Sequence, residues 1–173
     1  MQIRHATVAD AQAIARLGII TYTDTFGHTY SPEDLHAFLE SAYSVEYFIE
    51  VLSNPRQNIF VADDNGLLIG YAQMGPCALP HAEASLSQGE LKRMYVLKSH
   101  HNRGLGKQLL ELSLEWLEQH FPGPLWIGVW SENFGAQRLY ARYGFHKVGE
   151  YGFKVGKAVD LEWILRRPGG PAV

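Results

Sequence analysis

Several features that would mark particular classes of protein are missing from this sequence. There is a single cysteine, Cys77, so no disulfide can form within the chain, and we expect a reducing, cytoplasmic location. No apolar run approaches the roughly 18 residues that a membrane-spanning helix needs. The opening segment MQIRHATVAD has no apolar core of a signal peptide. We therefore expect no association with a membrane.

The charge balance and the histidines argue against two further classes. Lysine and arginine number 15 and aspartate and glutamate 18, so the formal net charge is −3 with histidine neutral. A protein that binds nucleic acid through its phosphates normally has a basic surplus, so nucleic acid is not an expected partner. The 8 histidines include no HxxxH pair, and only one cysteine accompanies them. Because this spacing does not suit zinc, we expect no metal site.

The remaining composition is that of an ordinary globular protein. The chain has 173 residues, of which 46% are hydrophobic and 19% charged. This length suits one domain, which we place at residues 1–167, followed by a flexible tail at 168–173 that is rich in proline and glycine. Strand-like and helix-like patterns alternate along the chain, which indicates an α/β (α+β) fold built in layers.

Local start and stop signals divide the chain into elements. Thr7, with Asp10 three residues later, is typical of a capping box, and Ser31 (followed by Pro32) and Ser44 are typical N-caps. Asn65-Gly66 between two apolar segments predicts a type I′ hairpin turn. The expected helices follow these three caps and also cover residues 104–120 and 133–143. The expected strands cover residues 1–5, 59–62, 67–74, 90–97, 125–130, 145–151 and 155–165.

The most informative segment is YVLKSHHNRGLGKQLL, which leads from a strand through a glycine loop into a long helix. The first N–H groups of a helix have no internal partner and lie at the positive end of its dipole. Gly104 and Gly106 let the backbone approach an anion, and Arg103 and Lys107 add positive charge. The loop lacks the GxxxxGKS/T spacing of a Walker A motif, and Leu109 stands where a Rossmann fingerprint needs its third glycine. The segment therefore predicts a pyrophosphate-binding loop, with a plain glycine-containing helix start as the alternative.

Two motifs resemble those of the Gcn5-related N-acetyltransferase (GNAT) family. HNRGLG at 101–106 resembles the acyl-CoA loop of that family, Gln/Arg-x-x-Gly-x-Gly/Ala, with His101 in place of the usual first residue. NFGAQRLYARYGF at 133–145 matches N-x-x-A-x-x-x-Y-x-x-x-G-F. The run ELKRMYVLKSHHNRGLGKQLLE, with IGVW before Asn133, looks most like the bacterial spermine/spermidine acetyltransferase branch.

The resemblance implies a fold and a co-substrate. The fold is the GNAT-type acyl-CoA N-acyltransferase fold, a central mixed, mostly antiparallel sheet of about seven strands flanked by four to five helices. The co-substrate is acetyl-CoA, whose pantetheine arm pairs with the gap between two diverging strands, where the N–H region of Tyr95 polarises the thioester. The implied contacts are Met94, Tyr95, Val96, His101, Asn102, Arg103, Gly104, Leu105, Gly106, Lys107, Asn133, Ala136 and Tyr140.

The second motif supplies a candidate proton donor. Asn133 and Tyr140 lie about two helical turns apart and share a face with Ala136. On the resemblance, Asn133 bonds the pantetheine amides, Ala136 leaves room for them, and Tyr140 protonates the leaving sulfur. The alternative for Tyr140 is a core aromatic at the end of a helix, as we expect for Tyr143.

Transfer to an amine also needs a proton acceptor, because an alkylamine with a pKa near 10.4 is mostly protonated at pH 7. Glu90, at the start of the strand before the loop, is the candidate, since a glutamate in the histone-acetylating branch matches this position. Its carboxylate would need a pKa raised by burial. A solvated strand-start residue is the equal alternative for Glu90, and a chain of water molecules could replace it. Cys77 has no motif of a nucleophile.

The acetyl acceptor is expected to be an amine, and several hypotheses for its identity are open. The stretch from Tyr22 to Tyr43 contains acids and aromatics that would suit a polyamine, unless it is an ordinary solvated helix face. These residues are Asp24, Phe26, Tyr30, Glu33, Asp34, Phe38 and Glu40. The other hypotheses are acetylation of a protein lysine or N-terminus, and an acyl-CoA-binding regulator without turnover. A homodimer is compatible with each of them.

Overall fold

The computed structural model describes residues 1–169, and it confirms the expected fold class. Seven strands form one sheet in the order β1-β2-β3-β4-β5-β7-β6, in which only the β4–β5 pair is parallel. The helices are α1 (Ala11–Phe26), α2 (Pro32–Ala42), α3 (Val45–Ser53), α4 (Leu105–His120) and α5 (Phe134–Ala141). The strands are β1 (Gln2–His5), β2 (Asn58–Asp64), β3 (Leu67–Pro76), β4 (Gly89–Val96), β5 (Leu125–Trp130), β6 (His146–Val155) and β7 (Ala158–Arg167). Short 3-10 helices are η1 (Val8–Asp10), η2 (Gly27–Thr29) and η3 (Lys98–His100).

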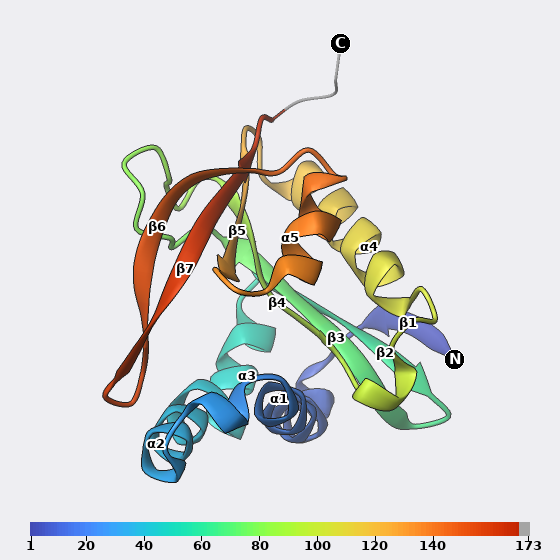
Figure 1. The fold of residues 1–173 in the computed structure, drawn as a ribbon. Helices are drawn as coiled ribbons and strands as arrows, with labels where there is room; N and C mark the ends of the chain where they lie inside the picture. Colours follow the sequence, from blue (N-terminus) through green and yellow to red (C-terminus); the bar gives the residue numbers. More distant parts are fainter. Residues whose placement is uncertain (170–173) are drawn as a thin grey trace.

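The helices cover the two faces of the sheet separately. Helices α4 and α5 lie together on one face, and α1, α2 and α3 gather near the other (Figure 1). Leu109, Leu110 and Leu117 of α4 belong to the first core, and Ile14 of α1 and Phe48 of α3 to the second. Each core is continuous with strand residues, so the sheet is buried from both sides at its centre. Within residues 1–169, no helix is both long and apolar enough to cross a membrane.

Most of the local signals in the sequence are confirmed. The Ser31 hydroxyl accepts a hydrogen bond from the Asp34 N–H at 3.1 Å, and Ser44 caps α3 in the same way through the Tyr47 N–H. Asn65 and Gly66 have φ of 56° and 90°, as a type I′ turn between β2 and β3 requires.

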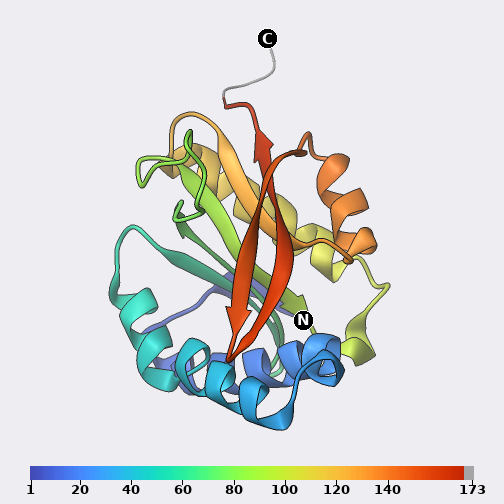
Figure 2. The same cartoon turned by 60° about the vertical axis from the view of Figure 1, so that its left-hand side comes forward.

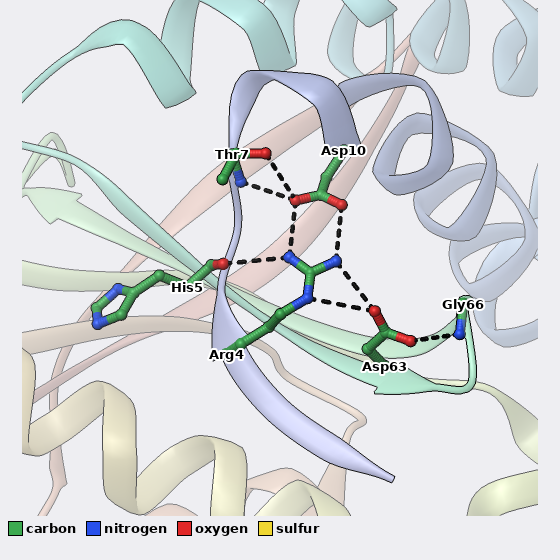
Figure 3. Close-up of polar contacts among 6 residues, drawn as sticks. All are labelled: Arg4, His5, Thr7, Asp10, Asp63 and Gly66. Atoms are coloured by element: carbon green, nitrogen blue, oxygen red, sulfur yellow. Dashed lines mark hydrogen bonds and ion pairs between the residues drawn. The ribbon is translucent and has the colours of Figure 1, made fainter.

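The N-terminal strand is fixed by one arginine (Figure 3). The Arg4 guanidinium donates to both carboxylate oxygens of Asp10 at 2.9 Å and to Asp63 at 3.1 and 3.2 Å. Asp10 also accepts from the Thr7 N–H, and Asp63 accepts from the Gly66 N–H. This cluster connects β1, η1 and the β2–β3 hairpin, so it holds the edge of the sheet to the start of α1.

The turn of the last hairpin was predicted wrongly. The sequence placed it between 151 and 155, but β6 continues through Gly152 to Val155, and the turn lies at Gly156 (φ 58°) and Lys157. Gly152 pairs with Leu161 on β7, and glycine suits this strand position because a Cβ there would approach Val159 to 2.8 Å. The hairpin reaches across to α2, where the Lys157 N–H donates to Asp34 at 2.7 Å (Figure 2). The predicted tail at 168–173 lies mostly, at residues 170–173, outside the described residues.

Candidate functional site

The main cavity of the described chain, about 410 Å³, lies where several elements meet around the middle of the sheet. Its walls come from β4 and β5, from α5, from the α1–α2 region and from the β6–β7 hairpin. Its aromatic lining consists of Tyr22, Phe26, Tyr30, Phe38, Tyr43, Tyr95, Trp130, Tyr140, Tyr151 and Phe153. Its charged lining consists of Glu90, Lys92, Arg93, Asp160 and Glu162.

Strands β4 and β5 separate at this cavity, as the family resemblance implied. They pair only from Gly89 to Leu91 on β4 and from Leu125 to Ile127 on β5. Beyond these residues the β5-facing edge of β4 has no strand partner among the described residues, so its backbone groups can bind a ligand, apart from the Val96 carbonyl oxygen, which the His101 ring occupies. Met94, Tyr95 and Val96, the predicted contacts, all lie on this unpaired stretch.

The loop before α4 has the geometry of an anion-binding helix start. Asn102 and Gly104 have φ of 61° and 75°, which turns the chain sharply into the helix. A Cβ built on Gly104 or Gly106 would meet no protein atom within 4 Å. At Gly106 the backbone φ is not positive, so neither strain nor a neighbouring atom explains the missing side chain. The open space lies beside free helix N–H groups, which fits a phosphate group bound there.

The side chains of this loop differ in their contacts and in their exposure to solvent. The His101 ring bonds the Val96 carbonyl oxygen at 2.8 Å and the His101 N–H donates to the Lys98 carbonyl oxygen at 3.3 Å, so this residue ties the loop back to β4 and η3. Leu105, the first residue of α4, is 2% exposed and its side chain packs in the core, so only its N–H can face a ligand. Arg103 and Lys107 are exposed, and Lys107 lies 3.8 Å from Glu111. Both cations are placed to meet phosphates from solvent.

Helix α5 brings its three predicted residues to the cavity wall. Asn133, Ala136 and Tyr140 all line the cavity. The Asn133 side-chain oxygen caps the helix by accepting from the Ala136 N–H at 3.2 Å, which leaves its NH₂ group for a ligand. Tyr140 is 7% exposed, and its hydroxyl has no hydrogen-bond partner among the described residues. Burial raises the pKa of Tyr140 to about 12, so the hydroxyl keeps its proton at neutral pH.

Glu90 lies in the cavity but is bound by other groups. Its Oε2 accepts from the Ala78 N–H at 2.9 Å and lies 3.2 Å from the Lys92 ammonium. The carboxylate is therefore held in place and partly neutralised by a cation. Nearby Cys77 is buried, and burial raises the pKa of its thiol to about 11, so it is not an activated nucleophile.

The acidic residues of the acceptor side come from elements other than those predicted. The aromatics Phe26, Tyr30 and Phe38 line the cavity as expected. The acids expected with them do not, because three, Asp24, Glu33 and Glu40, point to solvent and Asp34 binds the hairpin turn.

Two acids that the sequence analysis missed, Asp160 and Glu162 on β7, face the cavity instead. Tyr30 donates a hydrogen bond to Asp160, and Tyr151 donates one to Glu162 at 2.7 Å. The alternation in VDLEW could have indicated two acids on one strand face. Only the pairing of β7 with β5 shows that this face lines the cavity.

These features fit acetyl-CoA as co-substrate. The open space at Gly104 and Gly106 suits a pyrophosphate, the gap between β4 and β5 suits a pantetheine arm, and Tyr140 lines the same cavity. Among residues 1–169, no three His, Cys, Asp or Glu side chains gather into a group that could hold a metal ion.

Comparisons with known proteins agree with this geometry. Residues 21–145 match the acetyltransferase (GNAT) family model. An N-acetyltransferase of uncharacterized role from Lactobacillus delbrueckii subsp. lactis is 31% identical over 147 residues, which is 85% of each chain. An N-alpha-acetyltransferase of Sulfolobus acidocaldarius is 26% identical over 85% of this chain and 80% of its own. A probable spermine N(1)-acetyltransferase of Bacillus subtilis subsp. natto is 29% identical over 56% of this chain and 64% of its own.

The fold is also that of a solved acetyltransferase. The PaiA N-acetyltransferase of Thermoplasma acidophilum, solved in complex with coenzyme A, superposes with a TM-score of 0.75 at 18% identity, covering 96% of this chain and 98% of its own. The match of the family model over most of the chain and the identity of the Lactobacillus relative place the sequence in one family. The chain belongs to the acetyltransferase (GNAT) family, and it is an N-acetyltransferase that uses acetyl-CoA.

Proposed function

We propose that this enzyme acetylates a primary amine of a small cationic molecule such as spermidine or spermine. The observation that carries the proposal is the acceptor side of the cavity, where Asp160 and Glu162 face inward among aromatic rings. Carboxylates attract an ammonium group, and aromatic faces stabilise it further. The relative in Bacillus, a probable spermine N(1)-acetyltransferase, supports the same class of acceptor.

The cations of the cavity do not cancel this attraction. The Lys92 ammonium pairs with Glu90. The Arg93 guanidinium lies 4.3 Å from the Tyr43 ring centroid and donates to the Ala42 carbonyl oxygen at 2.7 Å. The three carboxylates that line the cavity outnumber these two cations, so the acids of β7 leave a negative charge for a cationic ligand.

The chemistry requires two proton transfers, and we assign one of them to Tyr140. Its protonated hydroxyl can supply the proton that the departing CoA sulfur needs. The other transfer removes a proton from the incoming ammonium group and needs a carboxylate or water. Glu90 is the candidate from the sequence, although its carboxylate is bound to Lys92.

A protein N-terminus or lysine is the second candidate acceptor, supported by the N-alpha-acetyltransferase relative. Three contacts across the acceptor side favour the smaller molecule. The β6–β7 hairpin is joined to the α1–α2 region by Asp34 with Lys157, by Tyr30 with Asp160, and by Phe38 with Phe153, whose ring centroids lie 5.7 Å apart. These bridges narrow the approach that an extended polypeptide would need.

The proposal is tested by thiol release from acetyl-CoA over a panel of polyamines, aminoglycosides, amino acids and peptides. We expect spermidine and spermine to support turnover and peptides to be poor acceptors. Turnover with peptides alone would replace the polyamine assignment with the second candidate. Tight CoA binding without thiol release from any amine would instead support a regulator. A homodimer and a cytoplasmic location stay predictions.

A further inference from the structure

On strand β7 the acidic side chains face the cavity and the apolar side chains face solvent, which is the reverse of the usual arrangement. Val159 and Leu161 are 62% and 47% exposed, whereas Asp160 and Glu162 line the cavity. Because side chains alternate along a strand, the opposite orientation of β7 would have buried the apolar pair and exposed the acids. Burying a carboxylate costs free energy unless it is well bonded. The reversed facing therefore indicates a functional role for these acids.

The Glu162 carboxylate lies next to the residues of β5 at which the pairing with β4 ends. Its strand partner on β5 is Trp130, the last residue of that strand. A Cβ on Gly128 would lie 3.3 Å from the Glu162 Oε2 and 3.1 Å from the Tyr151 hydroxyl, so the carboxylate and the phenol both lie directly over Gly128. Gly128 follows Ile127, the last β5 residue that pairs with β4. Glu162 is thus next to the gap in which the thioester is expected.

The other acids of the cavity are less suited to the reacting amine. Asp160 lies two residues nearer the hairpin turn, beyond the end of β5, and is bonded to Tyr30. Glu90 is paired with the Lys92 ammonium and bonded to the Ala78 N–H, so its carboxylate is already held by protein groups. Glu162 is bonded to a neutral phenol, so it keeps a full negative charge when it is ionised.

The surroundings of Glu162 also strengthen it as a base. Burial raises the pKa of Glu162, the Tyr151 hydrogen bond lowers it in part, and the charges of Asp160 and Glu90 raise it further. The titratable and charged groups that share the cavity with it are Tyr151 on β6, Asp160 on β7, Glu90, Lys92, Arg93 and Tyr95 on β4, Tyr22, Tyr30 and Tyr43 from the α1–α2 region, and Tyr140 on α5. A carboxylate with a raised pKa accepts a proton from an ammonium group more readily than an ordinary one.

We propose that Glu162 is the catalytic proton acceptor, with Tyr151 as the residue that positions it; this role rests on the proposed function, in which the acceptor arrives as an ammonium ion. One ammonium proton passes to Glu162. The nitrogen then bonds to the thioester carbon, the carbon–sulfur bond breaks, and Tyr140 gives its proton to the sulfur. A second proton leaves the nitrogen and, through water, restores the Tyr140 hydroxyl. Glu162 returns its proton to solvent, so the N-acetylated amine, the CoA thiol and one proton are released.

The first test is Glu162→Gln. At pH 7 we expect kcat to fall about 100-fold, the usual range for loss of a general base, with the KM for acetyl-CoA unchanged. The loss should shrink as the pH approaches the amine pKa near 10.4, and with acceptor amines of lower pKa, since a neutral amine needs no base. The matched control is Glu150→Gln, which removes an exposed carboxylate of the same hairpin that pairs with Lys147, and it should leave kcat unchanged.

Tyr151→Phe provides a second test that keeps the carboxylate. Removing the hydrogen bond that stabilises the ionised form raises the pKa of Glu162, so the acidic limb of the pH profile of kcat should move to higher pH. CoA binding and thermal melting of each variant establish that it is folded.

Two results would overturn the proposal. One is a Glu162→Gln loss that is the same at every pH and with every amine. The other is a pH-dependent loss in Glu90→Gln in place of Glu162→Gln. If the wild-type enzyme acetylates only peptides, the polyamine assignment fails. The kinetics of Glu162→Gln are then measured with a peptide as the acceptor, and they test the role of Glu162 separately.

Discussion

At the scale of single residues, the buried phenol of Tyr140 has the clearest assignment. Tyr140 is 7% exposed and lines the cavity, and its hydroxyl makes no hydrogen bond within the part of the chain that is described. Its ring packs edge-on to Phe145, with centroids 6.4 Å apart, so the orientation is fixed by the core. The hydroxyl is therefore available to a ligand, which the reading of Tyr140 as a plain core aromatic does not explain.

Tyr140→Phe should lower kcat by about 100-fold and leave the affinity for CoA nearly unchanged, because only the proton donor is lost. The free energy of unfolding should change little, since no intramolecular hydrogen bond is removed. Steady-state kinetics and CoA titration measure the two effects. The control is Tyr143→Phe, whose hydroxyl donates to Glu111 at 2.8 Å on the exposed side. Equal losses of kcat in both variants would remove Tyr140 from the chemistry.

At the scale of elements, the start of α4 combines a weak helix residue with open space. Gly106 lies in the first turn of the helix, where glycine costs roughly 1 kcal/mol relative to alanine. Because nothing in the protein occupies the position of its Cβ, this cost has no structural compensation. The space is explained if phosphate groups come close to the backbone there.

Gly106→Ala should therefore stabilise the fold and weaken CoA binding. We expect an increase of up to about 1 kcal/mol in the free energy of unfolding without ligand, measured by urea denaturation, and at least a tenfold rise in the Kd for CoA, equivalent to about 1.4 kcal/mol. Glu115→Ala, at an exposed position on the same helix, is the control for an added alanine away from the loop. Unchanged CoA affinity in Gly106→Ala would mean that the phosphates bind elsewhere.

The elements also show what the sequence could predict. The caps at Ser31 and Ser44, the Asn65–Gly66 turn and the loop before α4 were predictable because each depends on residues close together in the chain. The turn at Gly156 and the cavity-facing position of Glu162 were not. Both depend on the pairing of β7 with its neighbours, which brings together residues far apart in sequence.

At the scale of the whole molecule, the sheet is continuous in its first half and divided in its second. Strands β1 to β4 pair along their lengths, whereas β5, β7 and β6 join β4 through a short parallel contact. The cavity therefore lies between two parts of one sheet, and the stability of the first part can be changed without altering residues that line the cavity. The Arg4 cluster, at the far edge from β6 and β7, offers such a change (Figure 3).

The Arg4 cluster should make folding stability fall in acid. The hydrogen bonds from Arg4 lower the pKa of Asp10 from 3.8 to about 2, and the Gly66 N–H and Arg4 lower the pKa of Asp63. Because these folded-state values are depressed, the stabilisation is complete above about pH 4 and is lost as the pH falls toward 2. Asp10→Asn should cost about 1–2 kcal/mol at pH 6, discounted for partial exposure of the pair, and should flatten the dependence of unfolding free energy on pH between 4 and 2. Urea denaturation across this range measures both effects.

Glu40→Gln, which removes a carboxylate that is 75% exposed, is the control and should leave the slope as in the wild type. An unchanged slope in Asp10→Asn would show that the Arg4–Asp10 pair contributes no pH-dependent stability.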